Sequence, residues 1–509
     1  MDASALADRS SGESATWQIA TESARAKAAG RLTLALAAMA YLFVVLPVVL
    51  RGGPLRDDFD LCTSPRWTSG LARAALEVVP ETGAVRFPGR VTQALVISAL
   101  CAVTPFWVLI LLPLTLTLVA GALIFRLLVD LQVPAPWPHL GVAFWLLQPL
   151  GTESALWATQ FNIPFGLCMA LLASLAFRRG RPVTGALFGL IGYGFVEQVI
   201  FGLPLVAWLF SPRHQRRSAL AWAAGCSLTV LAVYAFWPGN SERTAVAMFE
   251  RLVAPAKDLF WYVKYPAVSF GLHSIPVAFL WALPMSAVVV AAAALAGAWL
   301  GPRLLPSHSV SLNRAFTRRG LGAFLTIIVL INVPLLTTLP HPSSPRTFTP
   351  TWLALVVAAT IAGSRIHWKR PRLAGACAYV LMSGSLLSLA LSVSVRVRTA
   401  DFTEASSKWL AERVPNGGSV LICDVPRTVV TPAPAGDFAV HELIHPVATE
   451  AAVRYYTGRQ LTVRRVGAMW PGPCSHEQGV DLVVSFDELP RSLSAGARTG
   501  MFRNAPTAP

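Results

Sequence analysis

Long apolar runs separated by short polar clusters make up most of the first 396 residues of the chain. A helix of about 20 apolar residues can cross a bilayer, and the runs lack the period-two alternation that marks membrane-spanning strands. Only helices and closed barrels satisfy the backbone in lipid, so the pattern predicts an α-helical polytopic membrane protein with about 11 transmembrane helices. The predicted spans are 31–50, 92–126, 138–150, 162–177, 183–195, 199–210, 219–237, 275–299, 321–339, 350–364 and 373–395.

Basic clusters predict the orientation, because cytoplasmic loops are enriched in arginine and lysine. The clusters lie at 178–181, 213–217, 314–319 and 365–372. All fall on one side, with the N-terminus inside and the C-terminus outside, if residues 92–126 cross the membrane once. Residues 92–104 are therefore predicted to form a juxtamembrane helix that is broken at Thr104-Pro105. Residues 183–210 are predicted to leave and return as two short helices with Glu197 at the tip.

The pattern changes at both ends of the membrane region, 31–396. Residues 1–30 carry mixed charge with many Ser and Ala residues and are predicted to form a loosely ordered cytoplasmic tail. Residues 397–509 contain short alternating apolar runs, which are typical of strands. We expect a small extracytoplasmic C-terminal α/β domain there, with strands near 419–423 and 480–485 and a helix near 448–456.

Composition agrees with a membrane protein. The 509 residues are 54% hydrophobic and 13% charged, with a mean hydropathy of +0.55, whereas soluble proteins carry about 25% charged residues. The formal net charge of +16 would suggest nucleic-acid binding in a soluble protein. Here the arginine clusters report cytoplasmic loops, and no basic stripe alternates with aromatic residues, so no nucleic-acid partner is expected.

Two uses of cysteine are expected among the seven in the chain. Cysteines that lie in apolar runs are predicted to be packing residues: Cys101, Cys168, Cys226 and Cys377. Cys423 and Cys474 could form a disulfide if the C-terminal domain faces an oxidising compartment.

Three carboxylates, Asp57, Asp58 and Asp60, lie within four residues in the first outward loop, 51–91. Ionised groups are costly in hydrocarbon, so these side chains must face water or line a polar cavity. A solvated acidic loop is the simpler interpretation of this stretch alone. The same predicted face also collects Arg90, Glu153, Glu197, His341 and Arg346, and this convergence of acids and bases from separate segments suggests a site.

The order and sidedness of five short motifs resemble the GT-C superfamily of integral-membrane glycosyltransferases, which use polyprenyl-phosphate-linked sugars. The motifs are the Asp57-Asp58 pair, residues 87–90, residues 153–157, the hairpin that carries Glu197, and residues 346–350. The resemblance covers the layout of the whole chain. An outward C-terminal domain is common in such enzymes.

The resemblance implies an inverting transfer in which a carboxylate takes the proton of the acceptor hydroxyl. Asp58 is the first candidate for this base and Asp57 the second. Glu153 could share a Mg²⁺ or Mn²⁺ ion with Asp57, since carboxylates suit these metals. The third acid, Asp60, leaves the choice of base open, and Glu153 stands where some relatives carry aspartate, which leaves metal use open.

The leaving lipid phosphate needs a cation, and Arg346 or Arg90 could bind it, with Glu197 and His341 as further substrate-binding candidates. Each has a simpler alternative. The two arginines could anchor helix ends at lipid headgroups, Glu197 could pair with a neighbouring helix, and His341 could be an ordinary loop histidine.

The sequence therefore predicts a multi-pass enzyme of the bacterial cytoplasmic membrane that moves a sugar to an extracytoplasmic glycan, lipid or protein acceptor. The bacterial assignment follows from the bias towards Ala, Arg and Leu. A transporter or flippase of lipid-linked sugars is a second hypothesis, although such proteins tend to show related halves, and no repeat is apparent here. An oligosaccharide polymerase or ligase is a third and would depend more on Arg and His.

Overall fold

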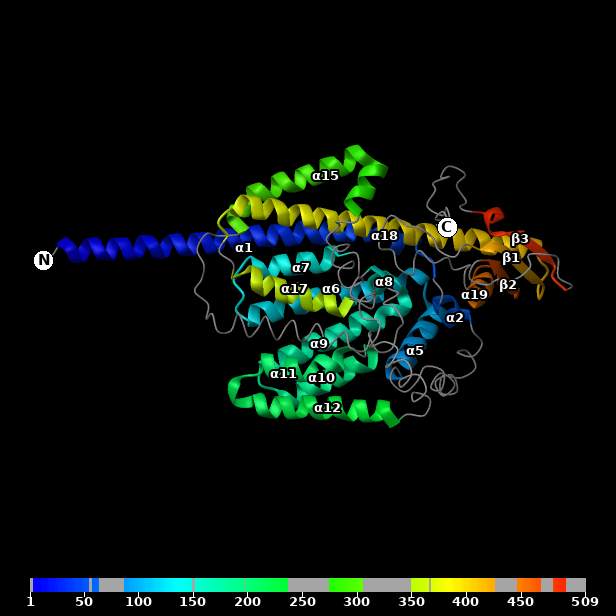
Figure 1. Ribbon diagram of the computed structural model, residues 1–509, viewed down its shortest axis with the longest axis horizontal. Helices are drawn as coiled ribbons and strands as arrows, with labels where there is room; N and C mark the ends of the chain where they lie inside the picture. The colour runs from blue at the N-terminus through cyan, green and yellow to red at the C-terminus, as the bar shows by residue number, and fades with distance from the viewer. Residues whose placement is uncertain are drawn as a thin grey trace, which may run out of the picture.

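The computed structural model describes residues 3–54, 57–63, 87–148, 152–196, 198–236, 274–304, 349–365, 368–425, 446–467 and 479–490. Most of these residues belong to helices that lie side by side along the long axis of the molecule (Figure 1). The predicted span at 321–339 lies outside the described residues.

Helices occupy the other apolar runs. They are α1 (Ala3–Arg51), α5 (Phe87–Val103), α6 (Phe106–Asp130), α7 (Trp137–Leu147), α9 (Asn162–Arg178), α10 (Pro182–Phe195), α11 (Gln198–Phe210), α12 (Arg216–Phe236), α15 (Ser274–Leu304), α17 (Thr349–Gly363) and α18 (Pro371–Arg413). Within the described ranges, four segments are long and apolar enough to cross a membrane: Ala24–Arg51, Phe106–Asp130, Ala158–Arg178 and Pro371–Arg413. Shorter apolar helices accompany them, as expected for a helical membrane protein.

Two predicted breaks are present in the helices. Helix α5 ends at Val103, and α6 begins at Phe106 after the Thr104-Pro105 step. Proline disfavours helical geometry in the residue before it, which explains the break. Helices α10 and α11 are likewise separate, with the Val196 N–H bonded to the Gly192 carbonyl at the end of α10.

Helix α1 differs from its prediction because it begins at Ala3 and includes the residues expected to form a loose tail. Its first 30 residues are rich in alanine, which has the highest intrinsic helix propensity. The hydrophobicity pattern located the span but gave no signal for this polar extension.

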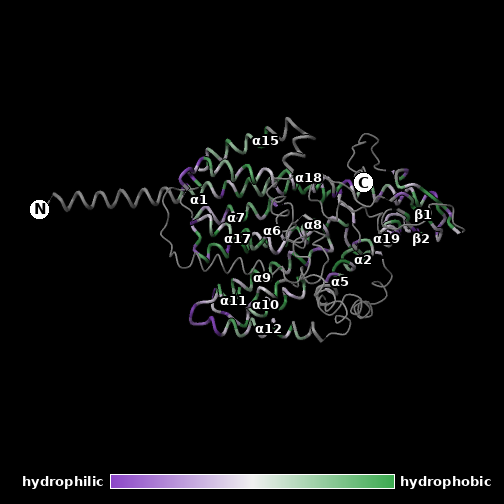
Figure 2. Tube along the Cα trace, viewed as in Figure 1, coloured by the Kyte–Doolittle hydropathy of each residue, from purple (hydrophilic) through white to green (hydrophobic). Residues whose placement is uncertain are grey.

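Figure 2 shows hydrophobic residues along the bundle and hydrophilic residues where α11 joins α12.

Small residues bring α15 and α18 into close contact. Gly297 and Gly301, one helical turn apart, face Gly375 and Pro371. A Cβ atom on Gly297 would lie 2.3 Å from the Gly375 carbonyl oxygen, so the two backbones are already in contact. Small residues at this spacing allow such close helix packing in membranes.

Gly297→Ala is therefore expected to destabilise the protein by about 1–3 kcal/mol, because the added methyl group must push the two backbones apart. Gly225→Ala in α12 is the matched control, since a Cβ there meets nothing within 4 Å. Thermal unfolding in detergent would check this. A Gly297→Ala protein as stable as the wild type would contradict the packing described here.

The chain ends in a small α/β unit. Strands β1 (Ser419–Val425), β2 (Thr462–Gly467) and β3 (Leu482–Ser485) form a parallel sheet in the order β2-β1-β3, and α19 (Pro446–Thr457) connects β1 with β2. Strands β1 and β3 and helix α19 lie near their predicted positions, whereas β2 was not predicted. Helix α18, however, runs unbroken past residue 396, where the C-terminal domain was expected to begin, and ends only at Arg413. The membrane region and the α/β unit therefore share one continuous helix (Figure 1).

Candidate functional site

Asp58 lies in α2 (Asp57–Thr63), a two-turn helix that follows α1. Its side chain is 0% exposed, and Oδ1 accepts a hydrogen bond of 2.9 Å from the backbone N–H of Thr159. Thr159 belongs to η2 (Ala158–Phe161), directly after the predicted motif at 153–157. A solvated acidic loop therefore does not describe Asp58, which makes a buried polar contact with the segment directly after the motif at 153–157.

Gln93 of α5 binds the backbone of the same residue, Thr159. Its side-chain amide donates to the Thr159 carbonyl, and the residue is 2% exposed. Gln93 lies three positions after Arg90, so the predicted motif at 87–90 also leads to η2. The sequence analysis missed Gln93, although a glutamine within an otherwise apolar run is a signal that could have identified it.

A second contact joins two more of the predicted motifs. Ser154 lies in α8 (Thr152–Leu156), and its Oγ is 3.3 Å from Oγ1 of Thr349, the first residue of α17. Both side chains are buried. The motif at 153–157 therefore meets the end of the motif at 346–350.

The hairpin between α10 and α11 reaches the same region. Asn162, the first residue of α9 after η2, donates from Nδ2 to the Phe195 carbonyl at 3.4 Å. Phe165 packs against the Phe195 ring with centroids 4.4 Å apart. Glu197, two residues beyond Phe195, lies outside the described residues.

A disulfide between Cys62 and Cys101 ties α2 to α5. The prediction that Cys101 is a packing residue is wrong, because its partner is distant in sequence and the apolar run around it concealed the pairing. Ser98 strengthens the same contact by donating to the Leu61 carbonyl at 2.8 Å. Cys423 in β1 is also disulfide-bonded, while Cys474 lies outside the described residues.

Helix α19 of the C-terminal unit also packs on α2. The Phe59 ring is fully buried and meets Tyr455 and Tyr456 edge to face, with centroids 5.6 and 5.7 Å away. The pKa of Tyr455 is raised above its usual value by burial and then by the nearby carboxylates of Asp58 and Glu404. Asp58 is therefore on a helix held between η2 and α19.

Arg396 of α18 fixes the chain just before α2. The side chain is 0% exposed, and Nη2 donates to the Gly53 carbonyl. A Cβ on Gly53 would meet the Tyr456 hydroxyl, so a larger residue here would require the Tyr456 side chain to shift. The sequence analysis missed Arg396 because it stands at the end of an apolar run, where an arginine is expected to reach a membrane interface.

For the other predicted site residues, the structure describes the helix at most and not the side chain. Asp57, Arg90 and Glu153 lie in α2, α5 and α8, but their side chains are outside the described part of the chain. His341 and Arg346 lie outside it entirely. No group of three His, Cys, Asp or Glu residues suited to a metal ion occurs among the described residues, a set that leaves out the side chains of both expected metal ligands.

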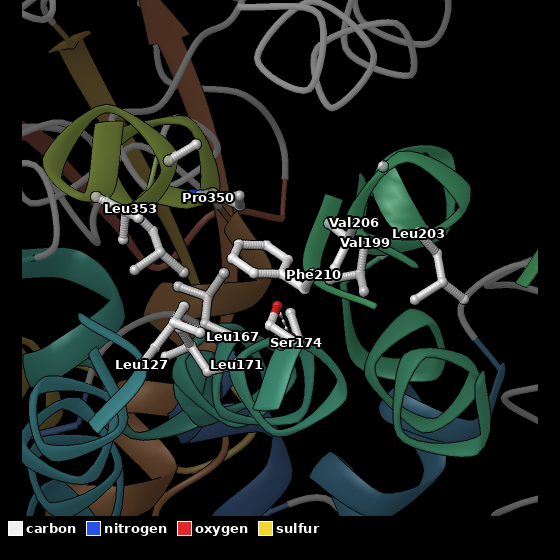
Figure 3. A pocket seen from close by; sticks show the side chains of 14 residues that line it. Leu127, Leu167, Leu171, Ser174, Val199, Leu203, Val206, Phe210, Pro350 and Leu353 are labelled. Atoms are coloured by element: carbon white, nitrogen blue, oxygen red, sulfur yellow. Dashed lines mark hydrogen bonds between the residues drawn. The ribbon is translucent and has the colours of Figure 1, made fainter. Parts of the chain in front are cut away.

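An apolar cavity of about 90 Å³ lies between α6, α9, α11 and α17 (Figure 3). Pro350, Leu353, Ala354 and Val357 form the α17 wall, a spacing that places them on one helix face. The remaining lining residues are Leu127, Leu167, Ala170, Leu171, Ser174, Val199, Gly202, Leu203, Val206 and Phe210. The Ser174 hydroxyl is bonded to the Ala170 carbonyl at 2.9 Å, so the lining is effectively hydrocarbon. Because Pro350 follows Thr349, the cavity begins one residue from the buried polar contacts.

Comparisons with protein families, curated proteins and solved structures find no match for the chain.

Proposed function

We propose that this protein is a membrane glycosyltransferase that moves a sugar from a polyprenyl-phosphate donor to an acceptor outside the membrane. The observation that supports this most strongly is the buried contact between Asp58 and the Thr159 N–H, which joins the acidic pair to η2, the segment directly after the motif at 153–157. The Gln93–Thr159 and Ser154–Thr349 contacts bring two further motifs to the same region. Segments in or next to four of the motifs, spread over about 300 residues, are thus linked by buried contacts, which supports a shared site of the kind that the GT-C resemblance implies.

In this proposal a carboxylate of α2, Asp58 or Asp57, accepts the proton of the acceptor hydroxyl as that hydroxyl attacks the sugar. Because Asp58 is fully buried, the acceptor reaches it only after α2 or α19 shifts, as in enzymes whose sites close over the substrate. Arg346 and Arg90 bind the leaving phosphate, assisted by Glu197 and His341. A Mg²⁺ or Mn²⁺ ion between Asp57 and Glu153 belongs to the same proposal.

The apolar cavity supports a lipid-linked donor. It begins at Pro350, next to the segment that carries Arg346, and follows α17 into the bundle. An isoprenoid chain bound there would leave its phosphate beside the buried polar contacts. Hydrocarbon lining suits such a chain, since burying each CH₂ group stabilises binding by about 0.8 kcal/mol.

The proposed orientation places α2, α5 and the C-terminal unit outside a bacterial cytoplasmic membrane, with about 11 spans and the N-terminus inside. Disulfides at Cys62–Cys101 and at Cys423 support an oxidising compartment for these elements. Basic clusters lie directly after α9, directly after α11 and directly before α18. They support a cytoplasmic location for these three helix ends.

Ala354→Leu is expected to raise the KM for a long-chain donor about tenfold, because the larger side chain occupies space that the isoprenoid chain needs. Ala354 is buried in the cavity wall, whereas Ala359 of the same helix is exposed and provides the control Ala359→Leu. Initial rates with long-chain and short-chain polyprenyl donors would check this. An equal KM for the long-chain donor in both variants would mean that the cavity does not bind the donor.

The function itself is tested with the full-length protein in proteoliposomes supplied with radiolabelled polyprenyl-phosphate mannose, glucose or arabinose. We expect the wild type to consume one donor, by transfer to an octyl glycoside acceptor or by slow hydrolysis. Movement of a donor across the bilayer without consumption would overturn the enzyme proposal in favour of a flippase.

A further inference from the structure

Helix α19 has two faces with different partners. Val453 packs into the core of the C-terminal unit with residues of α18 and the strands. Ala451 and Ala452 pack instead against Phe59 of α2, with Tyr455 and Tyr456 beside them. One helix of the C-terminal unit therefore forms a wall over the helix that carries Asp58.

Tyr455 is the residue of this wall whose polar group shares the surroundings of Asp58. Its ring lies edge to face with Phe59, the residue next to Asp58, and its side chain is only half-buried. Burial raises the Tyr455 pKa, and the charges of Asp58 and Glu404 raise it further. The phenol is a hydrogen-bond donor at neutral pH, as any tyrosine is. Glu404 is already paired with Lys408 at 2.6 Å.

The helical bundle and the α19 side of α2 suit different substrates. The cavity and the Ser154–Thr349 contact lie within the helical bundle, which a lipid-linked donor enters from the bilayer. Helix α19 approaches α2 from the α/β unit, at the end of α18 that extends beyond the bundle (Figure 1). A base and the acceptor hydroxyl must be in contact, so a hydrogen-bond donor on α19 whose ring packs on Phe59, the residue next to Asp58, is placed for the acceptor.

We propose that Tyr455 is an acceptor-binding residue whose phenol donates a hydrogen bond to the acceptor sugar, so that the C-terminal unit forms one wall of the acceptor site. This inference rests on the glycosyltransferase function proposed above. Tyrosine suits the role because its ring packs on apolar surface while its hydroxyl bonds at the polar rim.

Tyr455→Phe tests the inference, because it keeps the ring contact with Phe59 and removes only the hydroxyl. Transfer to octyl glycosides and hydrolysis of the donor by water are measured in the same reactions. We expect the acceptor KM to rise about tenfold, the effect of losing one hydrogen bond, with donor KM and donor hydrolysis unchanged. Tyr379→Phe is the control. It removes the phenol of a tyrosine in α18 that bonds to Thr33 of α1 at 2.6 Å and is not part of the contact between α19 and α2.

An unchanged acceptor KM in Tyr455→Phe would overturn the inference, as would an equal loss of transfer and hydrolysis, which indicates a purely structural role. Both outcomes leave the glycosyltransferase function standing. A wild-type protein that neither transfers nor hydrolyses any donor overturns the function and the inference together.

Discussion

Asp58→Asn is expected to lower the rate of sugar transfer by about 10²–10⁴-fold, the usual contribution of a general base. The amide cannot accept the proton of the acceptor hydroxyl. Its oxygen can still accept the 2.9 Å hydrogen bond from the Thr159 N–H, so α2 remains docked on η2. Initial rates with the radiolabelled donor, together with the thermal unfolding midpoint, would separate loss of chemistry from loss of fold.

Asp58→Ala provides the complementary measurement. It leaves the Thr159 N–H without its carboxylate partner in a buried site, which costs about 1–3 kcal/mol of stability in addition to the loss of transfer. We therefore expect both variants to be inactive and only the alanine variant to unfold earlier.

Asp130→Asn is the matched control for charge removal. Asp130, at the end of α6, pairs with Arg126 at 3.2 Å and with Arg179 at 3.4 Å, and both arginines are largely exposed. Such pairs contribute about 0–1 kcal/mol, and transfer should be unaffected. Wild-type transfer by Asp58→Asn would remove Asp58 as the base and leave Asp57 as the remaining candidate of the pair.

Local features of this fold were predictable from the sequence. The described apolar runs, the break at Thr104-Pro105 and two of the three strands of the C-terminal unit depend on neighbouring residues, and the structure has these near the expected positions. The acidic loop and the motif at 153–157 were expected to share a site. Asp58 bonds to Thr159, two residues beyond that motif, and the shared site stays a prediction.

The rest depends on contacts between segments far apart in the chain. Asp58 and Thr159 are 101 residues apart, and Arg396 bonds to a carbonyl 343 residues away, so no local pattern reveals either contact. Cys101 looked like a packing residue because its surroundings are apolar. The docking of α19 on α2 was equally hidden, since Tyr455 and Tyr456 fit any amphipathic helix. The site is therefore assembled by tertiary packing, although its motifs are visible in sequence.

The second large effect is expected at the disulfide between Cys62 and Cys101, which closes a segment with a sequence separation of 39 residues. The double variant C62S/C101S removes this constraint, and the chain-entropy relation gives a loss of about 4 kcal/mol for a loop of that length. Helix α2 has only seven residues, and helices this short are not stable alone in water. Its position therefore depends on the disulfide, on the Asp58–Thr159 bond and on the packing of Phe59.

Because α2 carries Asp58, releasing the disulfide should lower transfer as well as stability, and reducing agent should have the same effect on the wild type. The readouts are the unfolding midpoint and the initial rate of transfer, each measured with and without reductant. Cys226→Ser in α12 is the control, since Cys226 is a free thiol away from α2. If C62S/C101S unfolds earlier yet transfers sugar at the wild-type rate, the disulfide stabilises the fold without positioning Asp58. The Thr159 and Phe59 contacts would then be sufficient to hold the base in place.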